Sequence, residues 1–131
     1  MEIFVFGSNL AGRHGAGAAL EAKKRWGAIY GCGEGLQGQS YALPTKDATP
    51  WPDRPKTLSL EIIREKIVAF LEFAQLRSDL TFRMTRIGCG LAGYKDHQIA
   101  PMFRGAPQNI IFPTEWLPYL DRASPESTKR D

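Results

Sequence analysis

The chain has 131 residues, of which 43% are hydrophobic and 24% are charged. This balance is typical of one globular domain and excludes a largely disordered or membrane-embedded chain. The formal net charge of +3 permits a phosphate-bearing or polyanionic ligand without requiring one. The first residues, MEIFVFGSN, lack the basic region and long apolar run of a signal peptide, so we expect a cytoplasmic protein that makes no membrane contact.

The two cysteines argue against a metal site. Cys32 and Cys89 each stand between glycines in separate GCG triplets, with no second cysteine at CxxC spacing and no nearby histidine pair. We therefore expect reduced thiols, no bound metal and no cofactor.

The chain begins with a strand, a glycine-rich loop and a helix. Glu2 to Phe6 is a short β-prone run that ends at Gly7, Ser8 and Asn9. A loop rich in glycine and alanine follows up to Ala19. Apolar residues then recur four apart, which predicts a helix over Ala18, Ala22 and Trp26 with Lys23, Lys24 and Arg25 in its last turn and Gly27 as its stop.

The next segment is punctuated by glycine and proline. Gly31 to Gly38 predicts a flexible or tightly turning loop, and Ser40 to Leu43 a brief strand stopped by Pro44. Lys46 follows that stop. Asp47 to Lys56 contains three prolines and predicts an irregular surface loop.

A long amphipathic helix is predicted from Ser59 to about Leu76. Ser59 is a good N-cap, and Leu58 with Ile63 is a candidate hydrophobic staple. Apolar residues recur at helical spacing and form one stripe, made of Leu60, Ile63, Ile67, Phe70, Leu71 and Ala74. Arg64, Glu65 and Glu72 are expected to face outward.

The last third repeats the alternation of strand and helix. The predicted elements are a strand over Leu80–Ile87, a second glycine-rich loop over Gly88–Tyr94, a short helix over Asp96–Phe103, a strand over Asn109–Phe112, and a turn over Thr114–Leu120. Residues 123–131 are expected to form a flexible tail. Strands that alternate with helices predict an α/β layered fold.

Each glycine-rich loop follows a strand, and ligands of open α/β sheets bind at the carboxyl ends of strands. Glycine lets backbone N–H groups approach phosphate oxygens, so the two loops could hold a diphosphate between them. The alternative is that these glycines only make tight turns. Neither loop matches the P-loop or the dinucleotide-binding fingerprint, which weakens the case for ATP hydrolysis and for dinucleotide redox chemistry.

The loops also resemble a known family. FGSNLAGRHGAGAALEAKKRWGA resembles the first ligand loop and helix of macro domains, which bind ADP-ribose, and RIGCGLAGY resembles their second phosphate-binding loop. SYALPTK and the helix after Ser59 correspond to the family's middle strand and crossover helix. The branch of terminal ADP-ribose protein glycohydrolases and DNA ADP-ribosyl hydrolase antitoxins is the most similar part of the family. It too has a GAG-type loop, a TK after the middle strand and an IGCGL loop.

The resemblance implies a three-layer α/β/α sandwich with a mixed, mostly parallel sheet. It implies one domain over residues 1–122, without the segment that usually precedes the first strand in the family. That segment carries the aspartate that reads adenine, so the identity of the ligand's base stays open.

The resemblance also implies a set of site residues. Asn9 would lie near the distal ribose, and Lys46 matches the branch's catalytic lysine, which attacks the anomeric carbon of that ribose. A solvated loop lysine is the alternative for Lys46. The implied ligand-binding residues are Gly7, Ser8, Asn9, His14, Gly15, Ala16 and Gly17 in the first loop, and Gly88, Cys89, Gly90, Leu91, Ala92, Gly93 and Tyr94 in the second.

The sequence departs from the family where catalysis needs a carboxylate. Ala92 stands where the branch has its partner aspartate, and Ala16, Ala18 and Ala19 occupy the first loop, where other macro-domain hydrolases have an acid. The candidate substitutes are Asp47, Asp96 and Glu34, each of which is otherwise a surface charge.

Several further side chains have two interpretations. Phe112 or Tyr94 could stack on a base or ribose, or belong to the core or its rim. His14 could donate to a phosphate, and Arg13 could steer an anion or be an exposed loop residue. His97 has no visible catalytic partner.

Two functions follow from these residues. One is an ADP-ribosyl glycohydrolase that acts on protein or nucleic acid through Lys46. The other is a sensor or sequestering module that binds an ADP-ribose-like metabolite without turnover. Binding of unmodified nucleic acid has only the net charge in its favour, and the oligomeric state is open.

Overall fold

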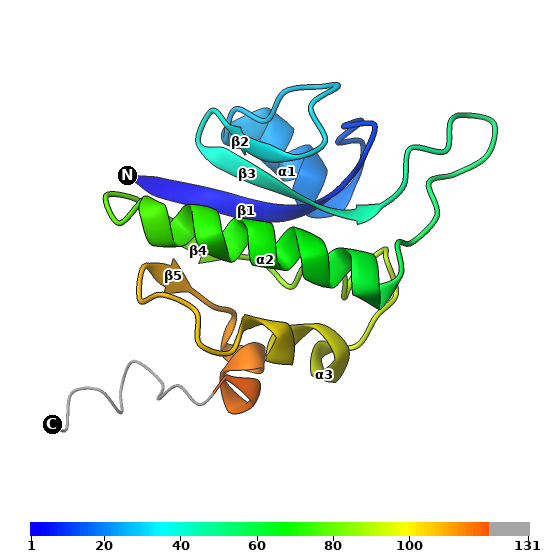
Figure 1. Ribbon diagram of the computed structural model, residues 1–131. Helices are drawn as coiled ribbons and strands as arrows, with labels where there is room; N and C mark the ends of the chain where they lie inside the picture. The colour runs from blue at the N-terminus through cyan, green and yellow to red at the C-terminus, as the bar shows by residue number, and fades with distance from the viewer. Residues whose placement is uncertain (121–131) are drawn as a thin grey trace, which may run out of the picture.

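A computed structural model describes residues 1–120 and shows a five-stranded sheet (Figure 1). The predicted tail, 123–131, lies outside the described residues. The strand order is β2-β3-β1-β4-β5, with β2 antiparallel to β3 and the other neighbours parallel. The strands are β1 (Glu2–Asn9), β2 (Gly35–Gln37), β3 (Ser40–Lys46), β4 (Thr81–Met84) and β5 (Ile110–Ile111).

Helices cover both faces of the sheet, which confirms the predicted three-layer α/β/α fold class. α2 (Leu60–Leu76) lies in front of the sheet in Figure 1, and α1 (Gly17–Arg25) lies behind it. Successive side chains of β1 pack on opposite faces of the sheet, because the side chains of a strand alternate with a period of two residues. Ile3 and Val5 belong to the large core under α2, and Phe4 and Phe6 to the smaller core under α1.

α2 forms as its sequence pattern predicts. The Ser59 hydroxyl accepts the N–H of Ile62 at 3.2 Å, which caps the helix. The apolar stripe is buried at its centre, and Leu58 and Ile63 both lie in the core beneath it. At the other end, the Asn109 amide donates to the carbonyl oxygens of Ala74 and Arg77 and so ties the strand β5 region to the end of α2.

Two predictions around the middle strand are wrong. Gly35–Gln37, predicted as loop, is the edge strand β2, because pairing with β3 overrides the weak strand propensity of its glycine. β3 does not stop at Pro44 but continues to Lys46. β2 pairs only with Ser40–Ala42, so at Pro44 β3 has one strand neighbour, β1, instead of two.

The C-terminal part is built from short helical turns. The single helix predicted over Asp96–Phe103 is instead a four-residue helix, α3 (Asp96–Ile99), followed by a 3₁₀ turn, η1 (Ala100–Phe103), that contains Pro101. A second 3₁₀ segment, η2 (Thr114–Tyr119), follows β5. Phe112 is buried in an aromatic cluster with Phe103 and Trp116, which confirms its core interpretation.

Candidate functional site

The strands that carry the candidate site end side by side. Asn9, the last residue of β1, is paired with Lys46, the last residue of β3. The N–H of Leu10 donates to the carbonyl oxygen of Lys46 at 3.0 Å, which fixes the start of the first loop beside that lysine. Lys46 is half-buried. The sequence pattern predicted Lys46 in a loop, whereas the structure places it on a strand end at the carboxyl edge of the sheet.

Asn9 organises the start of the first loop. Its backbone carbonyl accepts the N–H of Gly12 at 3.0 Å, and its side-chain Oδ1 accepts the N–H of Arg13 at 3.2 Å. The amide Nδ2 of Asn9 forms no hydrogen bond within residues 1–120. Asn9 therefore stabilises the turn through its two oxygens, and its side-chain N–H₂ group can donate to another acceptor.

His14 is an interior residue and not a surface one. Its side chain is 0% exposed and lies edge-on against Phe6. Its Nε2 contacts the carbonyl oxygen of Cys32 at 3.0 Å and Oε1 of Gln37 at 3.3 Å, and both partners are acceptors, which places the ring proton on Nε2. The resemblance implies that His14 is a ligand-binding residue, whereas its ring fastens the first loop to the segment after α1.

That segment, residues 28–34, crosses directly over the first loop. A Cβ atom on Gly12 would overlap the backbone nitrogen of Cys32, and one on Gly33 would lie 2.5 Å from the carbonyl oxygen of Asn9. The buried Ser8 hydroxyl donates to the Gly33 carbonyl oxygen at 2.5 Å. Gly12 and Gly33, which carry no Cβ, thus allow the two backbones to touch.

The end of the first loop presents free backbone donors. Ala16 precedes α1 in an extended conformation, without a capping side-chain hydrogen bond, and the first turn of α1 has no acidic residue. Within residues 1–120, no acceptor takes the N–H groups of Gly15 to Ala19. These exposed and half-exposed donors, together with the positive end of the helix dipole, favour an anion at this point.

The second loop, Gly88 to Tyr94, is packed at its start and open further on. Gly88 is buried against Ile99, but a Cβ atom added to Gly90 or Gly93 would meet no heavy atom within 4 Å. The N–H groups of Gly90, Leu91 and Ala92 donate to no residue in the described part of the chain. Leu91 is 72% exposed.

The two loops are neighbours. Leu91 Cδ1 lies 3.9 Å from the position that a Cβ would take on Gly17 at the start of α1. Deeper in the structure, the Gly88 nitrogen lies 3.7 Å from the corresponding position on Gly7. The expected juxtaposition of the two glycine-rich loops is therefore present, with unused N–H groups on both.

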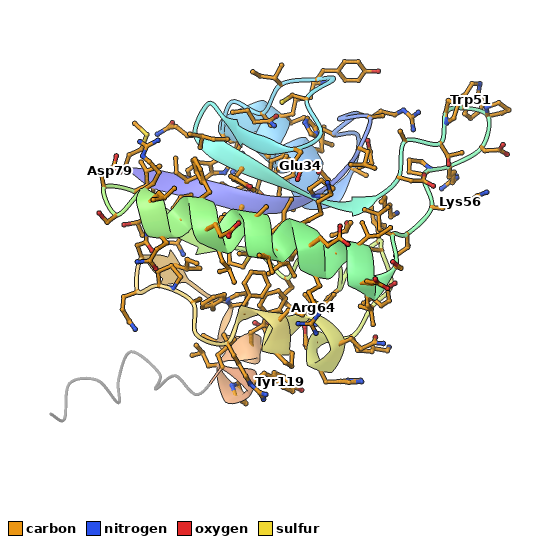
Figure 2. All side chains as sticks on the ribbon, viewed as in Figure 1. Glu34, Trp51, Lys56, Arg64, Asp79 and Tyr119 are labelled. Carbon is orange, nitrogen blue, oxygen red and sulfur yellow. The ribbon has the colours of Figure 1, made fainter. Side chains whose placement is uncertain are left out.

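A segment that sequence reasoning treated only as irregular loop joins the site. Residues 47–57, which we call the proline arm, project from the end of β3, with Trp51 near the tip and Lys56 on the returning stretch of chain (Figure 2). Arg13 of the first loop donates to the Thr49 carbonyl oxygen at 2.8 Å. Thr57 donates to the Ala92 carbonyl oxygen of the second loop at 2.8 Å. The base of the arm therefore links both loops.

The sequence-predicted substitutes for the missing aspartate all have partners. Asp47 accepts hydrogen bonds from the N–H groups of Thr49 and Lys56, which hold the pKa of its carboxyl below the usual range and close the base of the arm. Glu34 is paired with Lys66 of α2 at 3.0 Å.

Asp96 is similarly engaged. It accepts two hydrogen bonds from Arg86, which lower the pKa of its carboxyl, and a third from the Trp116 indole at 2.8 Å. Each of the three carboxylates thus has a structural task, and Ala92 leaves its own position without an acid.

A pocket lies beside the second loop. It has a volume of about 520 Å³ and is bounded by the second loop, α3 and η2. Tyr94, a predicted ligand residue, borders this pocket, but its hydroxyl donates to the Leu58 carbonyl oxygen at 2.7 Å. Gly15–Gly17 of the first loop and Gly90 and Leu91 of the second are exposed.

Two further observations concern the described residues. Within 1–120 there is no group of three or more side chains placed to hold a metal ion. No helix in the same range is long and apolar enough to cross a membrane.

Compared with known proteins, the chain matches no family model, no curated protein and no solved structure.

Proposed function

We propose that this protein binds ADP-ribose, or a closely related nucleotide derived from NAD, across its two glycine-rich loops. The observation that carries the proposal is the pair of adjacent loops, each with backbone N–H groups that no described residue uses. The start of α1 would take one phosphate and the N–H groups of Gly90 to Ala92 the other. Backbone donors of this kind suit a diphosphate, whose charge the helix dipole also stabilises.

The distal ribose would then lie at the carboxyl ends of β1 and β3. The free Nδ2 of Asn9 is a donor for a ribose hydroxyl, and Leu91 is an apolar side chain that could cover the sugar. The resemblance to macro domains, stated above from the sequence, supports the same orientation. His14 contributes through the loop it fastens and not through its ring.

For turnover, the candidate nucleophile is Lys46. The Lys46 amine would bond to the anomeric carbon as the bond to the acceptor group breaks, and the proton lost by the amine would leave with the acceptor. Ring opening gives a Schiff base, which water hydrolyses to free ADP-ribose and the original lysine. This route needs an acid or base other than residue 92.

A second function, binding without turnover, is favoured by a specific observation. Ala92 replaces the acid, and Asp47, Asp96 and Glu34 are all held in structural hydrogen bonds or ion pairs. A sensor or sequestering module needs only the two loops. The two functions share one ligand and differ in whether Lys46 reacts with it.

The experiment is a calorimetric titration of ADP-ribose into the purified protein, with AMP and ribose 5-phosphate as controls, followed by assays on ADP-ribosylated protein and DNA. Saturable binding of ADP-ribose, with much weaker binding of both fragments, supports the proposal. Turnover that disappears in Lys46→Ala while ADP-ribose affinity persists selects the glycohydrolase. Binding without turnover selects the sensor, and the absence of ADP-ribose binding overturns both.

A further inference from the structure

The pocket beside the second loop contains one carboxylate and several side chains that can donate hydrogen bonds. We call it the α3 pocket; its lining includes Arg86, Cys89, Gly90, Lys95, His97 and Tyr119. Figure 2 shows Tyr119 at the lower end of the molecule, on η2. A volume of about 520 Å³ is in the range of pockets that hold small molecules.

The one carboxylate in the lining is already saturated. Asp96 accepts Nε and Nη2 of Arg86 at 3.0 and 2.9 Å and the Trp116 indole N–H at 2.8 Å. The negative charge of Asp96 is therefore balanced by Arg86 and has little capacity for a further donor. The Cys89 thiol also lies beside Asp96, and burial raises the pKa of this thiol to about 12, so it adds no negative charge.

The other polar side chains of the pocket can donate hydrogen bonds: the Lys95 ammonium only donates, and the His97 ring and the Tyr119 hydroxyl can donate or accept. Lys95 and His97 are exposed, and neither forms an ion pair with any residue in the range 1–120. Gly90 and Gly93 have no side chain to obstruct approach to the pocket. Glu115 lies close enough to raise the pKa of Arg86 but is not part of the lining.

We propose that the α3 pocket binds the phosphate group of a small phosphorylated metabolite. A pocket rich in donors, with its carboxylate neutralised, has a deficit of acceptors that an anion supplies. A phosphate offers more acceptor oxygens to Lys95 and His97 than a carboxylate does. The α3 pocket shares the second loop with the proposed ADP-ribose site, but this inference rests on Lys95 and His97, which that site does not use.

The test is an amide NMR titration of the full chain with orthophosphate, ribose 5-phosphate and acetate, each against sodium chloride at equal ionic strength. We expect saturable shifts at Gly93, Lys95 and His97 with both phosphates and none with acetate. Lys95→Ala should weaken phosphate binding roughly tenfold, the loss of one hydrogen bond to a charged group. His97→Gln, at an exposed position, is a second variant that tests phosphate binding in the same pocket.

Lys24→Ala, which removes an exposed cation from the last turn of α1, is the matched control and should leave phosphate affinity unchanged. Equal weakening by Lys24→Ala, or equal binding of acetate, would overturn the proposal in favour of general charge attraction. Shifts confined to Gly15–Ala19 would overturn it too, by assigning phosphate to the first loop. Failure of ADP-ribose to bind would leave the α3 pocket result unaffected.

Discussion

The two GCG triplets of this chain have the same residues, but the third glycine of each lies in different surroundings. Gly31–Gly33 lies where two backbones cross, so that a Cβ on Gly33 would meet carbonyl oxygens at 2.5 Å. Gly88–Gly90 opens the second loop, where a Cβ on Gly90 would meet nothing within 4 Å. The first loop is thus held close to the crossing segment at Gly12, while the second loop has open space at Gly90 and Gly93. Both loops keep N–H groups that no described residue uses.

The largest expected effect separates the third glycines of the two triplets. Gly33→Ala forces backbone atoms apart at the crossing, so we expect a loss of about 3 kcal/mol or more in the free energy of unfolding, or failure to fold. Gly90→Ala enters open space and should change that free energy by less than about 0.5 kcal/mol. Urea denaturation of both variants measures the difference, and equal costs would contradict the contrast.

The two histidines allow a second comparison, between a buried side chain and an exposed one. His14→Ala removes a fully buried ring and its contacts to Cys32 and Gln37, with an expected loss of about 2–4 kcal/mol in the free energy of unfolding. His97→Ala, at an exposed position, should cost almost nothing. Thermal and urea unfolding give both values. A small effect of His14→Ala would show that the first loop is not fastened through this residue.

The link between the proline arm and the second loop sharpens the contrast further. Thr57→Val keeps the side-chain shape but removes the hydrogen bond to the Ala92 carbonyl oxygen, so stability should fall by about 1 kcal/mol or less. Because the second loop then loses a tether, ADP-ribose affinity should fall several-fold in calorimetry. Thr114→Val, at an exposed threonine on η2, is the matched control. Unchanged affinity in Thr57→Val would exclude a positioning role for Thr57.

A smaller effect is expected at the thiol of the second triplet. Burial, with Asp96 alongside, raises the pKa of Cys89 to about 12, so its thiolate is scarce near neutral pH. Cys89 should therefore react with iodoacetamide at pH 8 much more slowly than a free cysteine, and its rate should still be rising at pH 10. Mass spectrometry of each labelled cysteine follows the two sites separately. Fast labelling of Cys89 at pH 8 would contradict the raised pKa.

The sequence predicts the layers of this fold well because the signals are local. α2 follows from the Ser59 cap and a long apolar stripe, and β1 from a short β-prone run next to glycine. β2 and the extension of β3 through Pro44 depend on pairing between segments, which no local pattern reports. The sequence pattern predicts one helix over Asp96–Phe103 that contains Pro101, whereas the chain forms a 3₁₀ turn from Ala100 to Phe103.

The candidate site was predictable in outline and not in detail. The position of each glycine-rich loop after a parallel strand placed both loops at one edge of the sheet, and Gly17 and Leu91 do meet there. The burial of His14 could not be predicted, because its partners Cys32 and Gln37 are distant in sequence. The contacts of Arg13 and Thr57 with other segments were hidden for the same reason, as was the α3 pocket.

The most direct test of the central claim is an amide NMR titration of the full chain with ADP-ribose. We expect saturable shift changes at Gly15–Ala19 and at Gly90–Ala92 that fit one dissociation constant, because one diphosphate would occupy donors of both loops. Shift changes in only one loop, different constants for the two, or no saturable change would contradict a shared ADP-ribose site.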